Sequence, residues 1–163
     1  MKVAAPWLVL ALLFWLAAGI QHGAATKLAI FGATPDFLLV VAFCSSILMR
    51  PGAAAGLGFL AGLLQGAMAG ANLAQYVVSR VLTCFFIGYE SRLEFGVKVE
   101  FAALTVAIGT IVSGVLLTIL APPPEIWSSM RATIGTAIYN GVLAVPTYLL
   151  VRRTFKYQVE SRL

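Results

Sequence analysis

Long apolar stretches alternate with short polar, glycine-containing or proline-containing breaks along this chain. A membrane-spanning helix needs about 20 mostly apolar residues, with a range of roughly 17–25. By that criterion the pattern predicts six spans, at residues 7–25, 35–49, 53–71, 73–89, 99–121 and 131–151. The connections are too short to hold a domain outside the membrane. We therefore expect one all-α integral membrane domain over residues 1–163, built as a bundle of six transmembrane helices.

The breaks between these stretches have the residues that end helices. Arg50-Pro51-Gly52 forms a tight turn, Glu90–Glu94 is polar, and Pro122–Pro124 ends the fifth helix because proline lacks a backbone donor. The first stretch also resembles a secretory signal, with Gly23-Ala24-Ala25 as its cleavage pattern. Its apolar run is long for a signal, and cleavage would leave an odd number of helices. We therefore expect an uncleaved first span.

Composition and charge support a membrane protein. The chain is 61% hydrophobic and 10% charged, against roughly 45–50% and 25% in soluble domains. The net charge of +5 does not indicate nucleic-acid binding, because the basic residues flank the predicted helices and form no basic face with interleaved aromatics. Membrane lipid is the expected surrounding. By the positive-inside rule both termini should be cytoplasmic, since that side would hold Lys2, Arg50, Arg92, Lys98, Arg152, Arg153, Lys156 and Arg162, against Lys27 and Arg131 opposite.

Glycine recurs at every fourth position of the third predicted helix, at Gly58, Gly62, Gly66 and Gly70. Glycine costs a soluble helix about 1 kcal/mol relative to alanine, whereas in lipid it lets a second helix approach closely. Each step of four advances about 400° around the helix, so the row drifts and we expect it to contact more than one neighbour. Two interpretations stay open, packing inside the bundle and docking of a partner helix. The docking surface could include the Pro35–Asp36 entry to the second helix.

Polar residues within the apolar stretches are the remaining candidates for function. Arg80 lies well inside the fourth helix, so it should find an acceptor, a cavity or the membrane interface. The amides Gln65, Asn72, Gln75 and Asn140 could serve either helix packing or ligand contact. No paired carboxylates, activated nucleophile or phosphate loop can be recognised. We therefore predict a protein that is not an enzyme, with no catalytic, cofactor or metal site.

Several of these motifs, in this order, resemble the MreD family of rod shape-determining membrane proteins. They are PDFLL at 35–39, GLGFLAGLLQGAMAG at 56–70, Gly88-Tyr89, and Asn140-Gly141-Val142-Leu143 followed by Pro146 and Val151-Arg152-Arg153. The length, the six-span layout and the basic tail also fit, so the resemblance covers nearly the whole chain. One position departs from the family pattern, which often has an acidic residue after the Leu-Leu-Gln of the third helix. This chain has Gly66 there, so no role of that carboxylate can be carried over.

The resemblance implies a non-enzymatic scaffold of the cell-elongation machinery in the bacterial cytoplasmic (inner) membrane. Proteins like this one bind the single-pass protein MreC, and through it join MreB, RodA and the elongation penicillin-binding transpeptidase. The resulting complex positions peptidoglycan synthases for rod shape. Their fold is similar to the substrate-binding (S) subunit of energy-coupling-factor transporters. The alternative is a small-molecule, vitamin-like binding or transport subunit of the same fold. It would need a polar cavity open to the outside, to which Thr34, Asn72, Gln75 and Arg80 could contribute.

Overall fold

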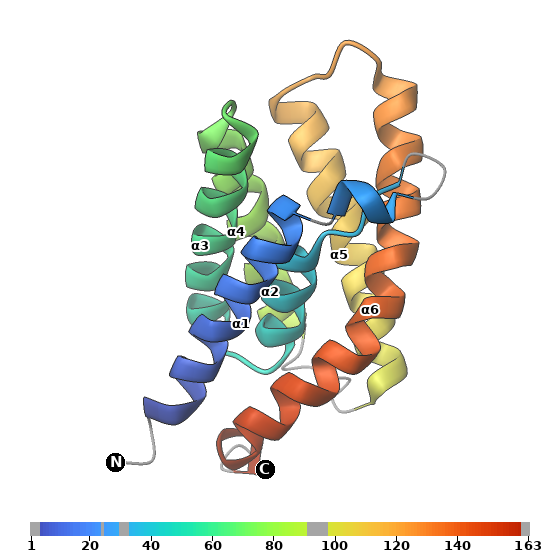
Figure 1. The fold of residues 1–163 in the computed structure, drawn as a ribbon. Coiled ribbons are helices and arrows are strands. Elements are labelled where there is room, and N and C mark those ends of the chain that lie inside the picture. The colour runs from blue at the N-terminus through green and yellow to red at the C-terminus, as the bar shows by residue number, and fades with distance from the viewer. Residues whose placement is uncertain (1–3, 24, 30–32, 91–97, 161–163) are drawn as a thin grey trace.

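The computed structural model describes residues 4–23, 25–29, 33–90 and 98–160. The predicted polar break at 91–94 and Ala24 of the predicted cleavage pattern lie outside these residues. Within them the chain is helical, and the start of α1 and the end of α6 lie at the same end of the bundle (Figure 1). The elements are α1 (Ala4–Gly23), the 3₁₀ helix η1 (Ala25–Leu28), α2 (Phe37–Ile47), α3 (Pro51–Ala69), α4 (Leu73–Glu90), α5 (Val99–Leu120) and α6 (Ile126–Glu160).

Three helices of the described chain are long and apolar enough to cross a membrane. These are Pro51–Ala69, Val99–Leu120 and the Ile126–Phe155 part of α6, while Trp7–Gly23 and Phe37–Ile47 are shorter apolar helices. The expectation of an all-helical membrane protein is confirmed. Six separate crossings stay a prediction, because α2 is short and α4 has polar residues such as Arg80 in its middle.

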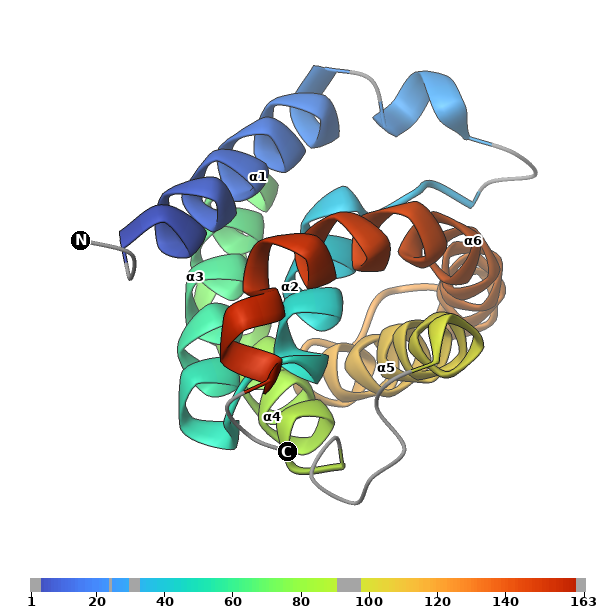
Figure 2. The same cartoon turned by 90° about the horizontal axis from the view of Figure 1, so that it is seen from below.

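The short helix α2 lies in the middle of the bundle and packs against the other five helices (Figure 2). Every residue from Leu38 to Ile47 is buried, as expected of a helix that is apolar on all sides. Its two serines donate to carbonyls of their own helix, Ser45 to Val41 and Ser46 to Ala42. With about 1.5 Å per residue, eleven residues cover roughly half of a hydrocarbon core about 30 Å thick. The chain therefore enters α2 at mid-bundle.

The glycines of α3 form a close contact with α4, which we call the glycine seam. A Cβ added to Gly62 would lie 2.5 Å from the Val77 Cα, and one added to Gly66 would lie 2.8 Å from the Leu73 Cα. At Gly58 it would meet the backbone carbonyl of Arg80. The prediction that the row contacts more than one helix was wrong. The added Cβ atoms meet α4 at steps of three to four residues, so a single antiparallel neighbour follows the row as it drifts.

Gly70 does not belong to the seam. Helix α3 ends at Ala69, and Gly70 is its C-cap with φ 67°, a left-handed conformation that favours glycine. A Cβ at this position would have nothing within 4 Å. The fourth glycine of the predicted row is therefore the C-cap that ends α3, and the chain reverses there into α4.

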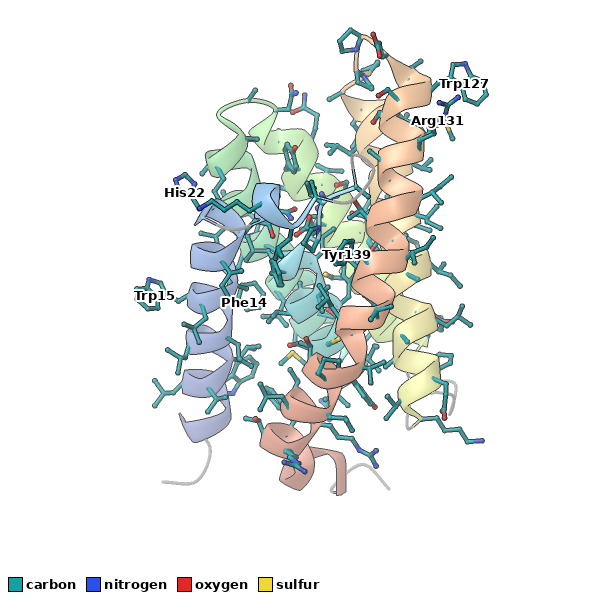
Figure 3. All side chains as sticks on the ribbon, turned by 45° about the vertical axis from the view of Figure 1, so that its right-hand side comes forward. Phe14, Trp15, His22, Trp127, Arg131 and Tyr139 are labelled. Carbon is teal, nitrogen blue, oxygen red and sulfur yellow. The ribbon has the colours of Figure 1, made fainter. Side chains whose placement is uncertain are left out.

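The predicted boundaries agree with the helices to within about two or three residues, except at α6. That helix runs from Ile126 to Glu160 rather than over 131–151. Its outer parts are polar or exposed, as at Arg131 and Arg153, and polar side chains in water do not end a helix. Trp127 and Arg131 mark the end of the bundle opposite to the start of α1 (Figure 3).

Helix α1 lies against one side of the bundle. Its residue Phe14 points inward and is 7% exposed, whereas the neighbouring Trp15 points away and is 74% exposed (Figure 3). The outer face of α1 is thus apolar, as a lipid-facing surface should be.

Candidate functional site

Residues 34–36 are non-helical and lead into α2 inside the bundle. Non-helical backbone at membrane depth is tolerated only where other protein groups satisfy its polar atoms. Side chains from α1 and α6 do so here. Asn140 Oδ1 accepts from the Asp36 N–H (2.9 Å), Gln21 Oε1 accepts from the Phe37 N–H (2.8 Å), and Thr136 Oγ1 donates to the Thr34 carbonyl (2.9 Å).

The Asp36 side chain joins this entry segment to α3. Its Oδ1 accepts from the Leu39 N–H at 3.0 Å, which caps the start of α2. Both carboxylate oxygens also accept from Gln65 Nε2, at 2.7 and 2.6 Å. The other end of the same amide, Gln65 Oε1, accepts from Arg80 Nε at 2.7 Å. A single amide therefore lies between a carboxylate and a guanidinium.

Arg80 is 4% exposed and connects α4 to both of its neighbours. Beside its bond to Gln65, its Nη1 donates to Ser79 Oγ at 3.0 Å, to the Ser113 carbonyl at 3.3 Å and to Ser113 Oγ. The ring of Tyr76 lies 5.4 Å from its Cζ, within the range of a cation–π contact. These acceptors offset the penalty of burying an arginine at membrane depth, at least about 2.5–3.5 kcal/mol on insertion scales.

Asn140 completes the arrangement from α6. It is fully buried, and its Nδ2 donates to Thr110 Oγ1 on α5 at 3.1 Å, while its Oδ1 holds the Asp36 N–H. We call the connected set the polar network. With Gln21 from α1 it joins all six α-helices of the described chain, through Gln21, Asp36, Gln65, Arg80, Thr110, Ser113 and Asn140.

A pocket of about 500 Å³ lies beside this network, between α4 and the α5–α6 pair. Asp36, Arg80 and Thr110 line its inner end, and Asn72 lies eight residues before Arg80, about 12 Å along a helix. The α3–α4 turn and the α5–α6 connection close to the pocket lie at the end of the bundle opposite to the start of α1 (Figure 1). The remaining lining residues are Leu39, Tyr76, Gly114, Leu117, Thr118, Ala121, Pro122, Pro123, Pro124, Ser129, Ala132, Thr133 and Thr136.

The structure gathers only some of the polar residues singled out from the sequence. Gln65, Arg80 and Asn140 meet around Asp36. We had expected Asn72 to lie within the bundle, but it is an exposed turn residue with φ 58°. Gln75 is half-buried in the first turn of α4.

The partner-binding candidates have separate places in the fold. Pro35 is fully buried, and Asp36 faces the network and the pocket. The glycine seam is covered by α4 within the same chain.

Sequence reasoning missed the hydroxyl groups of α5. Ser113 and Thr110 accept from Arg80 and Asn140, respectively. They lie three residues apart, so they share one face of an otherwise apolar helix. That spacing was visible in the sequence. Gln21, near the end of the first predicted span, was not singled out either, and only the fold brings it to the start of α2.

The arrangement is suited to holding helices together and to polar contact within the pocket. Among the described residues, no group of three or more His, Cys, Asp or Glu side chains is placed to hold a metal ion. The network's side chains instead contact each other and the backbone, which gives this part of the molecule a structural role and a polar lining.

Comparison with known proteins agrees with the family suggested by the sequence motifs. The model of the family described as rod shape-determining protein MreD matches residues 1–158. No curated protein and no solved structure matches the chain. The family match runs from before α1 almost to the end of α6, so it includes every element described above. The chain belongs to the MreD family of rod shape-determining membrane proteins.

Proposed function

We propose that this protein is a non-enzymatic membrane scaffold that binds MreC and helps to position peptidoglycan synthases during cell elongation. Membership of the MreD family gives the role in rod shape determination. The observation that carries the finer proposal is the polar network, whose reactive side chains bond to one another and tie the six helices together. A bundle fixed in this way offers partners a constant apolar outer surface, as helix-on-helix docking requires.

We further propose that the protein lies in the bacterial cytoplasmic membrane with both termini in the cytoplasm. The distribution of charge supports this orientation. Arg50 and Lys98 precede α3 and α5 at the end where α1 starts and α6 ends. From this position MreC would connect the protein to MreB, RodA and the elongation penicillin-binding transpeptidase.

The outer face of α3 is our first candidate for the MreC contact. The glycine seam is already occupied by α4, but Gly52 and Gly56 are exposed and an added Cβ there would meet nothing within 4 Å. These two glycines are four residues apart, the small-xxx-small spacing that lets a second helix approach closely. The proposed occupant is the single transmembrane helix of MreC.

Co-purification tests both parts of this proposal. Tagged protein and MreC are expressed together, and the wild-type complex is expected to survive extraction in mild detergent. Gly56→Leu should weaken co-purification while the protein elutes as a folded species. Gly19→Leu is the matched control, because Gly19 on α1 is equally open. Absence of MreC from folded wild-type protein would overturn the scaffold proposal, whereas an unaffected Gly56→Leu complex would overturn only the contact surface.

A small-molecule, vitamin-like binding or transport subunit is the second candidate function. The pocket beside Arg80 favours it, and the proposed six crossings and the proposed fold of a transporter's substrate-binding subunit would suit it. Among the described residues that line the pocket, Tyr76 is the only aromatic, while tight small-ligand sites are mostly apolar and aromatic. A thermal-shift screen of vitamins against purified protein discriminates, since a true ligand raises stability by mass action.

A further inference from the structure

The pocket beside the polar network has two charged groups of opposite sign at its inner end. Asp36 and Arg80 both line it, and the side-chain amide of Gln65 separates them. An arginine has five N–H donors. The hydrogen bonds of Arg80 use Nε and Nη1. Nε therefore bonds to α3 through Gln65, and Nη1 bonds to Ser79 and to α5 through Ser113.

The remaining nitrogen, Nη2, takes part in none of these bonds. Among the described residues it has no hydrogen-bond partner, although every fully enclosed side-chain nitrogen or oxygen has one. Nη2 is therefore not enclosed, and Arg80 lines the pocket. Among the described residues the two N–H donors of Nη2 thus have no partner, on a buried cation that lines a space a ligand could enter.

The carboxylate of Asp36 supplies the opposite charge. Its Oδ1 already accepts from Leu39 and Gln65, while Oδ2 accepts from Gln65 alone. A carboxylate oxygen has two lone-pair sites, so Oδ2 retains acceptor capacity beside the pocket.

Charge balance restricts the kind of ligand that this site would take. Asp36 and Arg80 together are neutral, so a ligand with net charge would bring an uncompensated charge into a partly buried site, which is unfavourable. A zwitterion adds no net charge. Its anionic oxygens can accept from Arg80 Nη2, and its ammonium can donate to Asp36 Oδ2.

Other residues that line the pocket could make further polar contacts with a ligand. The hydroxyls of Thr118 and Thr133 donate to carbonyls of their own helices, so toward the pocket they offer lone pairs that suit N–H donors. Asn72 and Tyr76, both on the α4 side, line the same space.

We propose that this pocket binds a zwitterionic group that carries an anionic oxygen-rich moiety and a primary ammonium. The same chemistry occurs in an ethanolamine phospholipid headgroup and in free phosphoethanolamine. The site sharpens the second candidate function by naming a ligand class, and it is independent of MreC binding. Loss of ligand binding would leave the scaffold proposal untouched, and failure to bind MreC would leave this site untouched.

The first measurement uses lipids. Protein in nanodiscs or detergent is titrated with phosphatidylethanolamine, phosphatidylcholine and phosphatidylglycerol, and lipid adducts are counted by native mass spectrometry. Phosphatidylethanolamine should bind about tenfold to a hundredfold more tightly, because it alone has both an anion and ammonium N–H donors. In parallel, free phosphoethanolamine is tested by thermal shift in a non-ionic detergent. Preference in the lipid arm identifies a headgroup, and stabilisation in the soluble arm identifies a free ligand.

Variants then locate the binding. Ala132→Phe adds a ring to a half-buried lining residue without touching the charges, and it should abolish binding in either arm. Ile134→Phe on the exposed side of α6 is its matched control. Asp36→Asn should remove the preference for phosphatidylethanolamine over phosphatidylglycerol. No selective binding in either arm, or binding that Ala132→Phe leaves unchanged in folded protein, would overturn the proposal.

Discussion

The two sides of α4 make opposite kinds of contact. On one side its backbone lies directly against the glycines of α3, with no room for a single added carbon at Gly62. On the other side its side chains Tyr76 and Arg80 face a pocket of about 500 Å³ in front of α5 and α6. Close approach in the glycine seam is gained by removing side chains, whereas the pocket is lined by polar and apolar side chains of facing helices. One helix therefore serves as a packing surface and as the wall of a site.

The largest expected effect comes from filling the glycine seam. Gly62→Leu forces a side chain against the Val77 backbone, which has no rotamer with which to move aside. Overpacking typically costs about 1–3 kcal/mol and occasionally more; with backbone as the obstacle we expect the upper end or above, and loss of most folded protein. Size-exclusion chromatography and the apparent Tm in detergent measure this.

Gly56→Leu is the control for that substitution. The same residue change is made on the same helix, at a position where an added Cβ meets nothing within 4 Å. Its apparent Tm should stay close to that of the wild type. Equal losses at Gly62 and Gly56 would mean that the added side chain itself, rather than its position in the seam, decides the result.

A second, smaller effect should follow from removing the amide between the two charges. Gln65→Leu keeps the approximate shape but leaves Arg80 Nε and the Asp36 carboxylate without this partner. Hydrogen bonds to charged groups contribute about 1.5–3 kcal/mol each in soluble proteins, and polar contacts in membranes average nearer 0.6 kcal/mol. We expect a loss of about 1–3 kcal/mol, measured by denaturation in mixed micelles.

Gln75→Leu is the matched test of position. Gln75 is half-buried in the first turn of α4 and lies outside the polar network. Its replacement should change the free energy of unfolding by no more than about 0.5 kcal/mol. If Gln75→Leu were as destabilising as Gln65→Leu, the polar network would not be the element that holds the helices together.

A third effect concerns the non-helical entry to α2. Asn140→Leu removes the acceptor of the Asp36 N–H and the donor to Thr110. An unsatisfied buried backbone donor costs about 1–3 kcal/mol, but the pocket close to Asp36 can admit water, so we expect about 1–2 kcal/mol. Amide hydrogen exchange at residues 36–39 should accelerate. If amide exchange at residues 36–39 were unchanged while the free energy of unfolding fell, the destabilisation would arise elsewhere in α6 and not at the entry to α2.

The helices were predictable from the sequence, whereas the partners of the polar residues were only partly so. Apolar length located α3, α4 and α5 to within two residues, because the membrane dictates that length. The spacing of Gly58, Gly62 and Gly66 indicated close packing. It could not name α4 as the neighbour, since drift around a helix is compatible with one crossing partner or with several.

The location of the network depended on tertiary structure. The sequence placed Asp36 at the entry to a helix, but α2 begins in the middle of the bundle. Because α2 is short, the residue at its start, Asp36, lies at the centre of the bundle. Ser113 and Thr110 escaped notice because hydroxyls in apolar helices usually bond to their own backbone, as Thr110 does to Val106. Only the positions of α4 and α6 show that Ser113 and Thr110 also accept from Arg80 and Asn140.

The smallest expected effect compares two glycines that are both too close to a neighbour for an added Cβ. At Gly114 on α5 the obstacle is the side chain of Thr133 on α6, which can change rotamer, whereas at Gly62 it is backbone. Gly114→Ala should therefore cost about 1 kcal/mol or less, and Gly62→Ala about 1–3 kcal/mol. Adding Thr133→Ser removes the methyl group that Gly114→Ala meets and should restore the apparent Tm, which Gly62→Ala with Thr133→Ser should not. Restoration in both double variants would contradict the difference between a backbone seam and a side-chain contact.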